Sequence, residues 1–246
     1  LMLVIFPFEE AVYREPGIPV EFVGHPLIEL VKTGTPRAAW LAELGFEPNA
    51  PTIALLPGSR PNEVAQLLPP LLDAVRTIVG QVPTAQFIVA RASGLDDRLF
   101  GRAAAWEGPG RVSVVDGRTD DALSVADLVV TASGTATIQA AIHGRPMVII
   151  YRVSPLTYAL GKRFVHVDTY GMVNLVAGQS IVPELIQDQC TPGVIAAEVV
   201  GYLTNDERMR QTRALLDEVR TRLGGAGASR RAAEAVLAVA NRAATS

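Results

Sequence analysis

The stretch that decides the fold is IALLPGSRPNEVAQLLPPLLDAVRTIVGQVPTAQFIVA, residues 53–90. It opens with an apolar run at 53–57 and closes with another at 86–90. Between them, from Pro61 to Gly80, the apolar residues recur at helical spacing. A buried strand, a helix and a second buried strand in this order form a right-handed crossover between parallel strands. The stretch therefore predicts a parallel sheet covered by helices.

The same alternation extends to both sides of this stretch. Further apolar runs, each bounded by Gly, Pro or polar turn residues, lie at 3–6, 20–23, 111–115, 127–132 and 147–151. Runs of this kind are typical of strands that are buried on both faces. From about residue 50 to 180 we therefore predict one α/β domain with a doubly wound parallel sheet.

The two ends of the chain depart from this pattern. After residue 190 we expect a helical region, with helices at 191–203, 206–223 and 229–244. The Gly-rich sequence GGAGAS at 224–229 separates the last two helices. Residues 1–24 contain two strands and one short helix that complete no unit. We expect them to be the end of a preceding domain, so the chain is expected to be a fragment of a longer protein.

Composition excludes several classes of protein. Of the 246 residues, 49% are hydrophobic and 19% are charged, which is typical of a globular chain and not of a disordered one. With 22 Lys and Arg against 25 Asp and Glu, no basic field is available to bind nucleic acid. One cysteine, Cys190, allows no internal disulfide, which fits a reducing cytosol. No apolar run approaches the roughly 20 residues of a membrane span, and residues 1–15 lack the basic start and the small-residue cleavage site of a signal peptide.

Two turns are suited to binding phosphate. Gly58, Ser59 and Arg60 follow the run at 53–57, and Ser133, Gly134 and Thr135 follow the run at 127–132 directly before a helical segment. Backbone N–H groups at helix starts and an Arg side chain are common phosphate ligands. Alone, each turn is explained equally well by an ordinary strand-to-helix turn or a capped helix start. The two together favour a diphosphate site without a metal.

A third candidate group comprises Asn174, Glu184 and Gln187. A carboxylate beyond a diphosphate loop could accept both hydroxyls of a ribose. Because Pro183 precedes Glu184 and such a pair also opens helices, a Glu that interacts with a helix dipole is an equally good reading. Both readings stay open at this stage. The three histidines, His25, His143 and His166, are too scattered to form a zinc site. His25, in the turn Gly24-His25-Pro26, could face a ligand, but we expect a structural role for it and for the other two.

Several familiar motifs are absent from the sequence. It contains no Walker A loop, no G-x-G-x-x-G after a strand, no G-x-S-x-G elbow and no H-E-x-x-H. We therefore set aside a P-loop kinase, a dinucleotide oxidoreductase, a serine hydrolase and a zinc peptidase.

Four segments together resemble the lipid-A-disaccharide synthase family: FPFEEAVYREPGIPVEFVGHPL, LLPGSRPNEV, TASGTATIQAAIHGRPMVIIYRVSPLTYALGKRFV and YGMVNLVAGQSIVPELIQDQCTP. They occur in this order from residue 4 to about 195. The resemblance implies a type B glycosyltransferase (GT-B) fold, in which two Rossmann-like domains face each other across a cleft. This chain would then hold a remnant of the N-terminal domain at 1–24, the UDP-sugar-binding domain at 25–227 and a C-terminal crossing helix at 228–246.

The resemblance also implies a reaction and its site residues. The reaction is the inverting, metal-independent transfer of 2,3-diacylglucosamine from UDP to the 6-hydroxyl of 2,3-diacylglucosamine 1-phosphate (lipid X), with no cofactor. Gly58, Ser59, Arg60, Ser133, Gly134 and Thr135 would hold the diphosphate, and Asn174, Glu184 and Gln187 would lie at the nucleotide and ribose. The general base, an Asp in the family, would lie in the N-terminal domain, so no catalytic residue is assigned here.

The acylated substrates imply a peripheral enzyme at the inner membrane of a Gram-negative bacterium. The segment 155–164 mixes apolar and basic residues and suits a membrane surface, although a buried helix with a basic end explains it equally well. We expect the apolar face of the last helix either to fray or to pair with a second chain as a homodimer. Other GT-B enzymes acting on UDP-sugars, such as a glucosaminyltransferase or a 2-epimerase, and a nucleotide-binding module without turnover remain alternatives.

Overall fold

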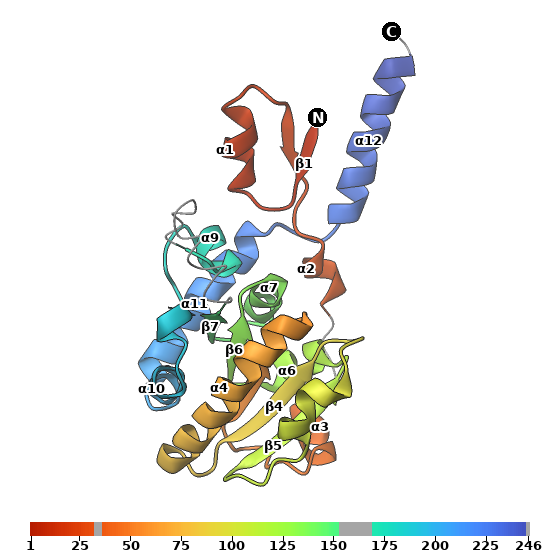
Figure 1. The fold of residues 1–246 in the computed structure, drawn as a ribbon. Helices are drawn as coiled ribbons and strands as arrows, with labels where there is room; N and C mark the ends of the chain where they lie inside the picture. The colour runs from red at the N-terminus through yellow and green to blue at the C-terminus, as the bar shows by residue number, and fades with distance from the viewer. Residues whose placement is uncertain (32–35, 153–168, 245–246) are drawn as a thin grey trace.

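Six parallel strands form the main sheet, in the order β5-β4-β3-β6-β7-β8 (Figure 1). The computed structural model describes residues 1–31, 36–152 and 169–244. The strands are β3 (Thr52–Leu56), β4 (Gln86–Arg91), β5 (Arg111–Asp116), β6 (Leu128–Ala132), β7 (Met147–Tyr151) and β8 (Glu184–Ile186). The first five were predicted, β8 was not, and the doubly wound parallel sheet is confirmed.

Helices cover both faces of this sheet. Ile53 and Leu55 of β3 point to one face, and Ala54 and Leu56 point to the other. The first face is covered by α4 (Pro61–Gln81), α10 (Pro192–Leu203), η1 (Asp97–Phe100) and α5 (Gly101–Ala104). The second face is covered by α3 (Arg37–Glu43), α6 (Thr119–Val125), α7 (Thr135–Ile142), α9 (Met172–Ala177) and α11 (Asp206–Arg222). Both faces of each central strand are therefore buried, which explains their continuous apolar sequences.

The helices begin where the sequence has start signals. Pro61 is the first residue of α4, and the hydroxyl of Thr191 accepts a hydrogen bond from the Val194 N–H at the start of α10. The side chain of Asn205 caps α11 in the same way, by accepting from Arg208. The predicted helical region after residue 190 is confirmed, with η2 (Gln187–Gln189) just before it.

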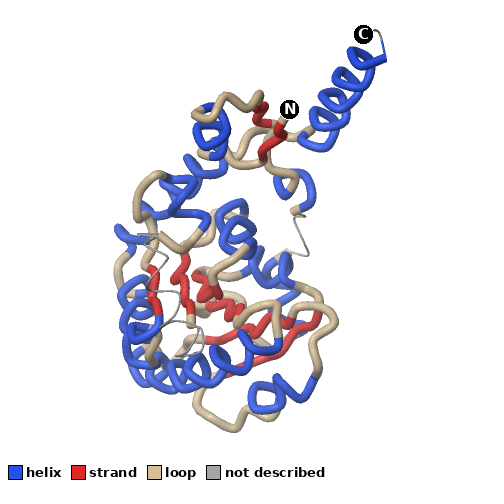
Figure 2. Tube along the Cα trace, turned by 45° about the horizontal axis from the view of Figure 1, so that its top comes forward, coloured by secondary structure: helices blue, strands red, loops and turns tan. Residues whose placement is uncertain are grey.

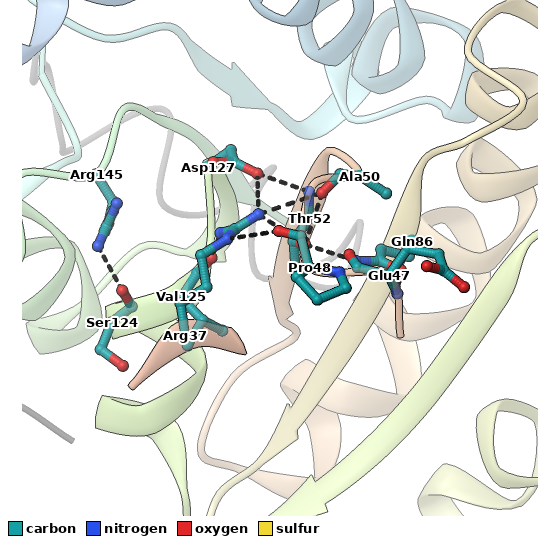
Figure 3. Close-up of polar contacts among 10 residues, drawn as sticks. All are labelled: Arg37, Glu47, Pro48, Ala50, Thr52, Gln86, Ser124, Val125, Asp127 and Arg145. Carbon is teal, nitrogen blue, oxygen red and sulfur yellow. Dashed lines mark hydrogen bonds and ion pairs between the residues drawn. The ribbon is translucent and has the colours of Figure 1, made fainter. Parts of the chain in front are cut away.

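A network of polar side chains joins the amino ends of β3, β4 and β6 (Figure 3). The Arg37 guanidinium donates to the Asp127 carboxylate at 2.9 Å and to the carbonyl of Val125. Asp127 also accepts the Thr52 N–H at 2.9 Å, and the Gln86 amide donates to the Thr52 hydroxyl at 3.0 Å. The network fixes α3 and the end of α6 to three neighbouring strands.

A small unit lies apart from the sheet body, at the top of Figure 1. It consists of β1 (Met2–Val4), α1 (Glu9–Arg14) and β2 (Val20–Phe22), and its two strands are parallel. The helix α12 (Ala228–Ala244) projects from the body on the same side (Figures 1 and 2). A two-stranded sheet is seldom stable by itself. The assignment of residues 1–24 to a preceding domain stays a prediction.

The chain passes between the small unit and the body at one place, which we call the joint: residues 23–29, ending within α2 (Leu27–Leu30), and residues 223–231. The His25 N–H donates to the Leu223 carbonyl at 2.8 Å, and the Arg231 Nε donates to the Val23 carbonyl at 2.8 Å. The Glu29 carboxylate accepts the N–H of Ala228 at 2.9 Å, at the start of α12. Two segments distant in sequence are thus bonded side by side.

The apolar face predicted for the last helix is largely uncovered. That face comprises Ala232, Ala233, Ala235, Val236, Leu237, Val239 and Ala240. Ala235 is buried, whereas Val236, Leu237 and Val239 are 59%, 61% and 44% exposed. The helix itself forms as predicted.

Candidate functional site

The two predicted phosphate turns meet at the carboxyl edge of the sheet. They follow β3 and β6, which are neighbours at the point where the strand order reverses. In open α/β sheets this switch point is where ligands bind. A pocket of about 280 Å³ lies there, lined by Gly58, Ser59, Arg60, Ser133, Gly134 and Thr135. The structure therefore brings together all six residues that the sequence assigns to a diphosphate.

The first turn depends on a glycine. Gly58 has a φ of +124°, and a Cβ there would lie 2.6 Å from the Cβ of Glu63. The turn leads into α4, with Arg60 as the N-cap and its side chain 80% exposed. Glu63, in the first turn of α4, accepts the Ser59 N–H at 3.0 Å and pairs with the Arg60 guanidinium at 3.0 Å.

The second turn presents the start of α7 to the pocket. Gly134, Thr135 and Ala136 line the pocket, and the first N–H groups of a helix have no carbonyl partner within it. Such N–H groups, together with the helix dipole, favour an anion. The Ser133 hydroxyl is held by donation to the Tyr170 carbonyl at 2.7 Å.

Asn174 and Glu184 lie near the pocket but do not line it. The Glu184 carboxylate accepts the N–H groups of Tyr170 and Gly171 at 2.7 and 3.0 Å, and the Asn174 amide at 2.7 Å. Asn174 is buried, and its side-chain oxygen accepts the N–H groups of Ile181 and Val182. Both side chains thus tie the start of α9 to β8.

The reading of Glu184 as the opening of a helix is wrong. Glu184 is the first residue of β8, where it pairs with Ile149 of β7. Its carboxylate does accept hydrogen bonds at a helix start, but that helix is α9. The Ser133 hydroxyl donates to the backbone carbonyl of Tyr170, and the Glu184 carboxylate accepts the backbone N–H of the same residue. Tyr170 therefore connects Glu184 and its partner Asn174 to the second turn.

Gln187 follows β8 in an unusual conformation. Its φ is +50°, and it is buried. Non-glycine residues with positive φ cost conformational energy and are concentrated at functional sites. Gln187 does not line the pocket, so its predicted contact with the nucleotide stays a prediction.

Four polar residues that line the pocket were missed from the sequence: Glu63, Thr119, Thr131 and Gln139. Gln139 lies one turn after Thr135 on the same face of α7, and this spacing is the signal that could have found it. Its amide nitrogen lies 3.4 Å from the Asp120 carboxylate. His143 Nε2 lies 3.4 Å from the same oxygen, and burial lowers the pKa of His143, with Asp120 opposing that shift.

The other predictions from single residues have mixed outcomes. His25 is buried, and its Nδ1 accepts the Leu27 N–H at 3.2 Å, which is the structural role expected of it. His166 and the segment 155–164 lie outside the described residues. Among the described residues, no three His, Cys, Asp or Glu side chains form a cluster that could hold a metal ion. No helix within the same ranges is both long and apolar enough to span a bilayer.

A family model for lipid-A-disaccharide synthetase matches residues 1–239. The chain belongs to this family. Lipid-A-disaccharide synthase of Geobacter metallireducens is 44% identical over 236 residues, which cover 96% of this chain and 61% of the relative. The synthase of Myxococcus xanthus is 39% identical over 237 residues, with the same two coverages. The chain thus spans about 61% of the length of these lipid-A-disaccharide synthases.

Solved structures share the fold. UDP-GlcNAc 2-epimerase of Neisseria meningitidis, solved bound to UDP-GlcNAc, superposes with a TM-score of 0.69 at 13% identity, covering 96% of this chain and 60% of that one. The calicheamicin glycosyltransferase CalG4 superposes with a TM-score of 0.57 at 18% identity, covering 96% and 51%. The predicted Rossmann-like half of a GT-B fold is therefore confirmed for this member of the lipid-A-disaccharide synthetase family.

Proposed function

We propose that the pocket between the two turns binds the diphosphate of a UDP-sugar. The observation that carries this proposal is the convergence of Gly58–Arg60 and Ser133–Thr135 on one pocket at the switch point. N–H groups at the start of α7 and the Arg60 guanidinium are suited to phosphate oxygens. We also propose that the nucleoside contacts Asn174, Glu184 and Gln187, of which Glu184 is connected to the second turn through Tyr170.

The reaction we propose follows from family membership. The 6-hydroxyl of 2,3-diacylglucosamine 1-phosphate attacks the anomeric carbon of UDP-2,3-diacylglucosamine, a β-1,6 bond forms with inversion, and UDP leaves. N–H donors and a cation at the diphosphate stabilise the negative charge that develops on departing UDP, which takes the place of a metal. A base must take the proton of the attacking hydroxyl, and we place it in the N-terminal part of the longer relatives.

The remaining assignments concern the whole enzyme. We propose that residues 1–24 belong to the N-terminal domain, that 25–227 form the UDP-sugar-binding domain and that 228–246 form the crossing helix. Because both substrates carry acyl chains, the enzyme is proposed to work as a peripheral protein on the cytoplasmic surface of the inner membrane. A homodimer through the last helix is part of the same proposal.

The substrate distinguishes this function from its alternatives. A glucosaminyltransferase or a 2-epimerase of the same architecture accepts a UDP-sugar without acyl chains, whereas the proposed reaction needs them on both substrates. Turnover of unacylated UDP-GlcNAc would favour those alternatives. A chain that binds UDP and gains no turnover when a full N-terminal domain is joined to it would be a binding module.

The first test is UDP binding by the chain as it stands. We expect weak binding by calorimetry, with Arg60→Ala lowering the affinity roughly tenfold because a charge-assisted contact is lost. Since the Arg60 side chain is 80% exposed, its loss should leave the melting temperature almost unchanged. Arg102→Ala, which removes a 64% exposed cation from α5, is the control and should not change the affinity.

Two results would contradict the assignment. No interaction at millimolar UDP, with the protein shown to be folded, would rule out the site as a whole. A fall in melting temperature that parallels the loss of affinity would assign Arg60 a structural role.

A further inference from the structure

Glu63 is an acidic residue inside the pocket proposed for a diphosphate. It lines the pocket together with both turns, and its two carboxylate oxygens have different partners. Oε2 accepts the Ser59 N–H at 3.0 Å, and Oε1 pairs with Arg60 Nη1 at 3.0 Å. These are a backbone donor and a guanidinium, the same two kinds of group that phosphate oxygens take as partners in proteins.

The two partners are not equally available to a ligand. A backbone N–H has a single hydrogen, so a Ser59 N–H that donates to Glu63 cannot at the same time make a linear bond to phosphate. Arg60 has five N–H hydrogens and uses few of them here, so its guanidinium can bind a phosphate while it keeps Glu63. The competition between carboxylate and phosphate therefore centres on Ser59.

Glu63 is held close to this donor but is able to leave it. Its Cβ lies so near Gly58 that a side chain at position 58 would collide with it, so the stem of Glu63 is fixed against the turn. The carboxylate is less confined, because the side chain is 25% exposed and its hydrogen bonds to described residues are these two. Rotation of the outer bonds would move the charge away without any movement of α4.

We propose that Glu63 is a built-in competitor of the diphosphate. Its carboxylate takes the Ser59 N–H, must give it up when a phosphate oxygen binds there, and repels the negative charge of the nucleotide. The consequence is weaker binding and faster release of UDP, whose diphosphate carries more negative charge than the diphosphate of a UDP-sugar. This inference rests on the proposed function, because it assigns Glu63 a role within the same pocket.

The test is Glu63→Gln, which removes the charge and keeps the size and an acceptor for the Ser59 N–H. Affinities for UDP, pyrophosphate and uridine are measured by calorimetry with the native chain and the variant. We expect UDP and pyrophosphate to bind roughly fivefold more tightly to the variant, as the removal of one like charge about 4 Å away predicts. Uridine, which has no phosphate, should bind equally to both. Glu218→Gln, an exposed residue of α11, controls for net charge.

The outcomes separate this inference from the proposed function. UDP binding by the native chain tests whether the pocket binds a nucleotide. The ratio of the UDP affinities of Glu63→Gln and the native chain tests whether Glu63 competes with the diphosphate. Unchanged or weaker binding of both UDP and pyrophosphate to Glu63→Gln would overturn the inference, and weaker binding would make Glu63 a positioning residue for Arg60. The Ser59 amide resonance gives a second readout: it should shift in Glu63→Gln, and it should shift on addition of pyrophosphate to the native chain. A Ser59 resonance that does not respond to pyrophosphate would also overturn the inference.

Discussion

His25 lies in the joint, where burial determines its protonation. Burial lowers the pKa of His25, and the nearby Glu9 carboxylate opposes that shift in part. The ring lies 4.9 Å from that of Phe6, and its Nδ1 accepts the Leu27 N–H. A proton on Nδ1 would remove this acceptor, so the folded chain favours neutral His25.

The stability of the chain should therefore depend on His25 at acid pH. Above the ordinary histidine pKa of about 6.5 both folded and unfolded chains hold a neutral ring, so the full contribution of His25 is present. As the pH falls below that value the unfolded chain binds the proton first, and the free energy of unfolding decreases until the lowered folded pKa is passed. In His25→Asn, whose side-chain oxygen can accept the Leu27 N–H, urea unfolding between pH 7 and 5 should show a smaller decrease. Equal decreases in the two proteins would refute the role of His25.

For individual site residues, the sequence predicted where the residues of the two turns lie in the fold, but it did not predict the hydrogen-bond partners of Asn174 and Glu184. The residues of both phosphate turns could be found because they follow apolar strands directly, and the carboxyl ends of parallel strands lie at one edge. The bonds between Asn174, Glu184 and the backbone at 170–171 could not be predicted, because they depend on how α9 is placed against β8. Glu63 was overlooked because an acidic residue in the first turn of a helix is common for reasons of the helix dipole alone.

At the scale of elements, the Arg37 network decides how α3 and α6 meet the sheet. Asp127 precedes β6 and accepts the N–H of Thr52, which lies 75 residues earlier in the chain at the start of β3, so it joins these two strands. Its side chain is 31% exposed, and that of Arg37 is 32% exposed. Partly buried, charge-assisted bonds of this kind contribute more than those of an open surface pair.

Asp127→Ala tests this joining of elements. We expect the free energy of unfolding to fall by about 2 kcal/mol, because Asp127 takes both the Thr52 N–H and the Arg37 guanidinium. Asp73→Ala is the control, since Asp73 is 52% exposed and lies 3.8 Å from Arg102, and it should cost less than about 0.5 kcal/mol. Equal losses in urea unfolding would mean that the network contributes no more than a surface ion pair.

The strands of the main sheet differ in whether the sequence alone predicts them. β3, β4 and β6 are central strands with apolar residues on both faces, so each appears in the sequence as a continuous run. β8 has three residues, and among the described strands it is the last of the sheet, with β7 as its one neighbour. Its sequence, PELIQ from Pro183, has no such run, so only its pairing with β7 reveals it as a strand.

For the molecule as a whole, the exposed face of α12 is the feature that calls for a partner. Val236 and Leu237 are each more than half exposed on a helix that projects from the body (Figure 1). Exposed apolar faces of this kind seldom persist on a monomer. Contact between the α12 faces of two chains would cover these residues, and the Gly-rich segment 224–229 is the hinge about which the helix could move into such a pair.

Light scattering over a range of concentrations should show a dimer, which Leu237→Lys weakens by placing a charge on the face. Asn241→Lys, which adds the same charge without removing an apolar side chain, is the control. If α12 frays instead, residues 228–244 should exchange their amide hydrogens much faster than the sheet. A strict monomer whose last helix is as protected as the sheet would exclude both outcomes.

The joint also has a topological consequence. Because the His25 N–H donates to the Leu223 carbonyl, the body of the protein begins and ends at one point. A segment whose two ends touch can be circularly permuted with a short linker, or inserted into a surface loop of another protein, without strain on its sheet. The described residues that line the pocket proposed for a diphosphate lie between positions 56 and 139 of that body, so the pocket would travel with the transplanted segment.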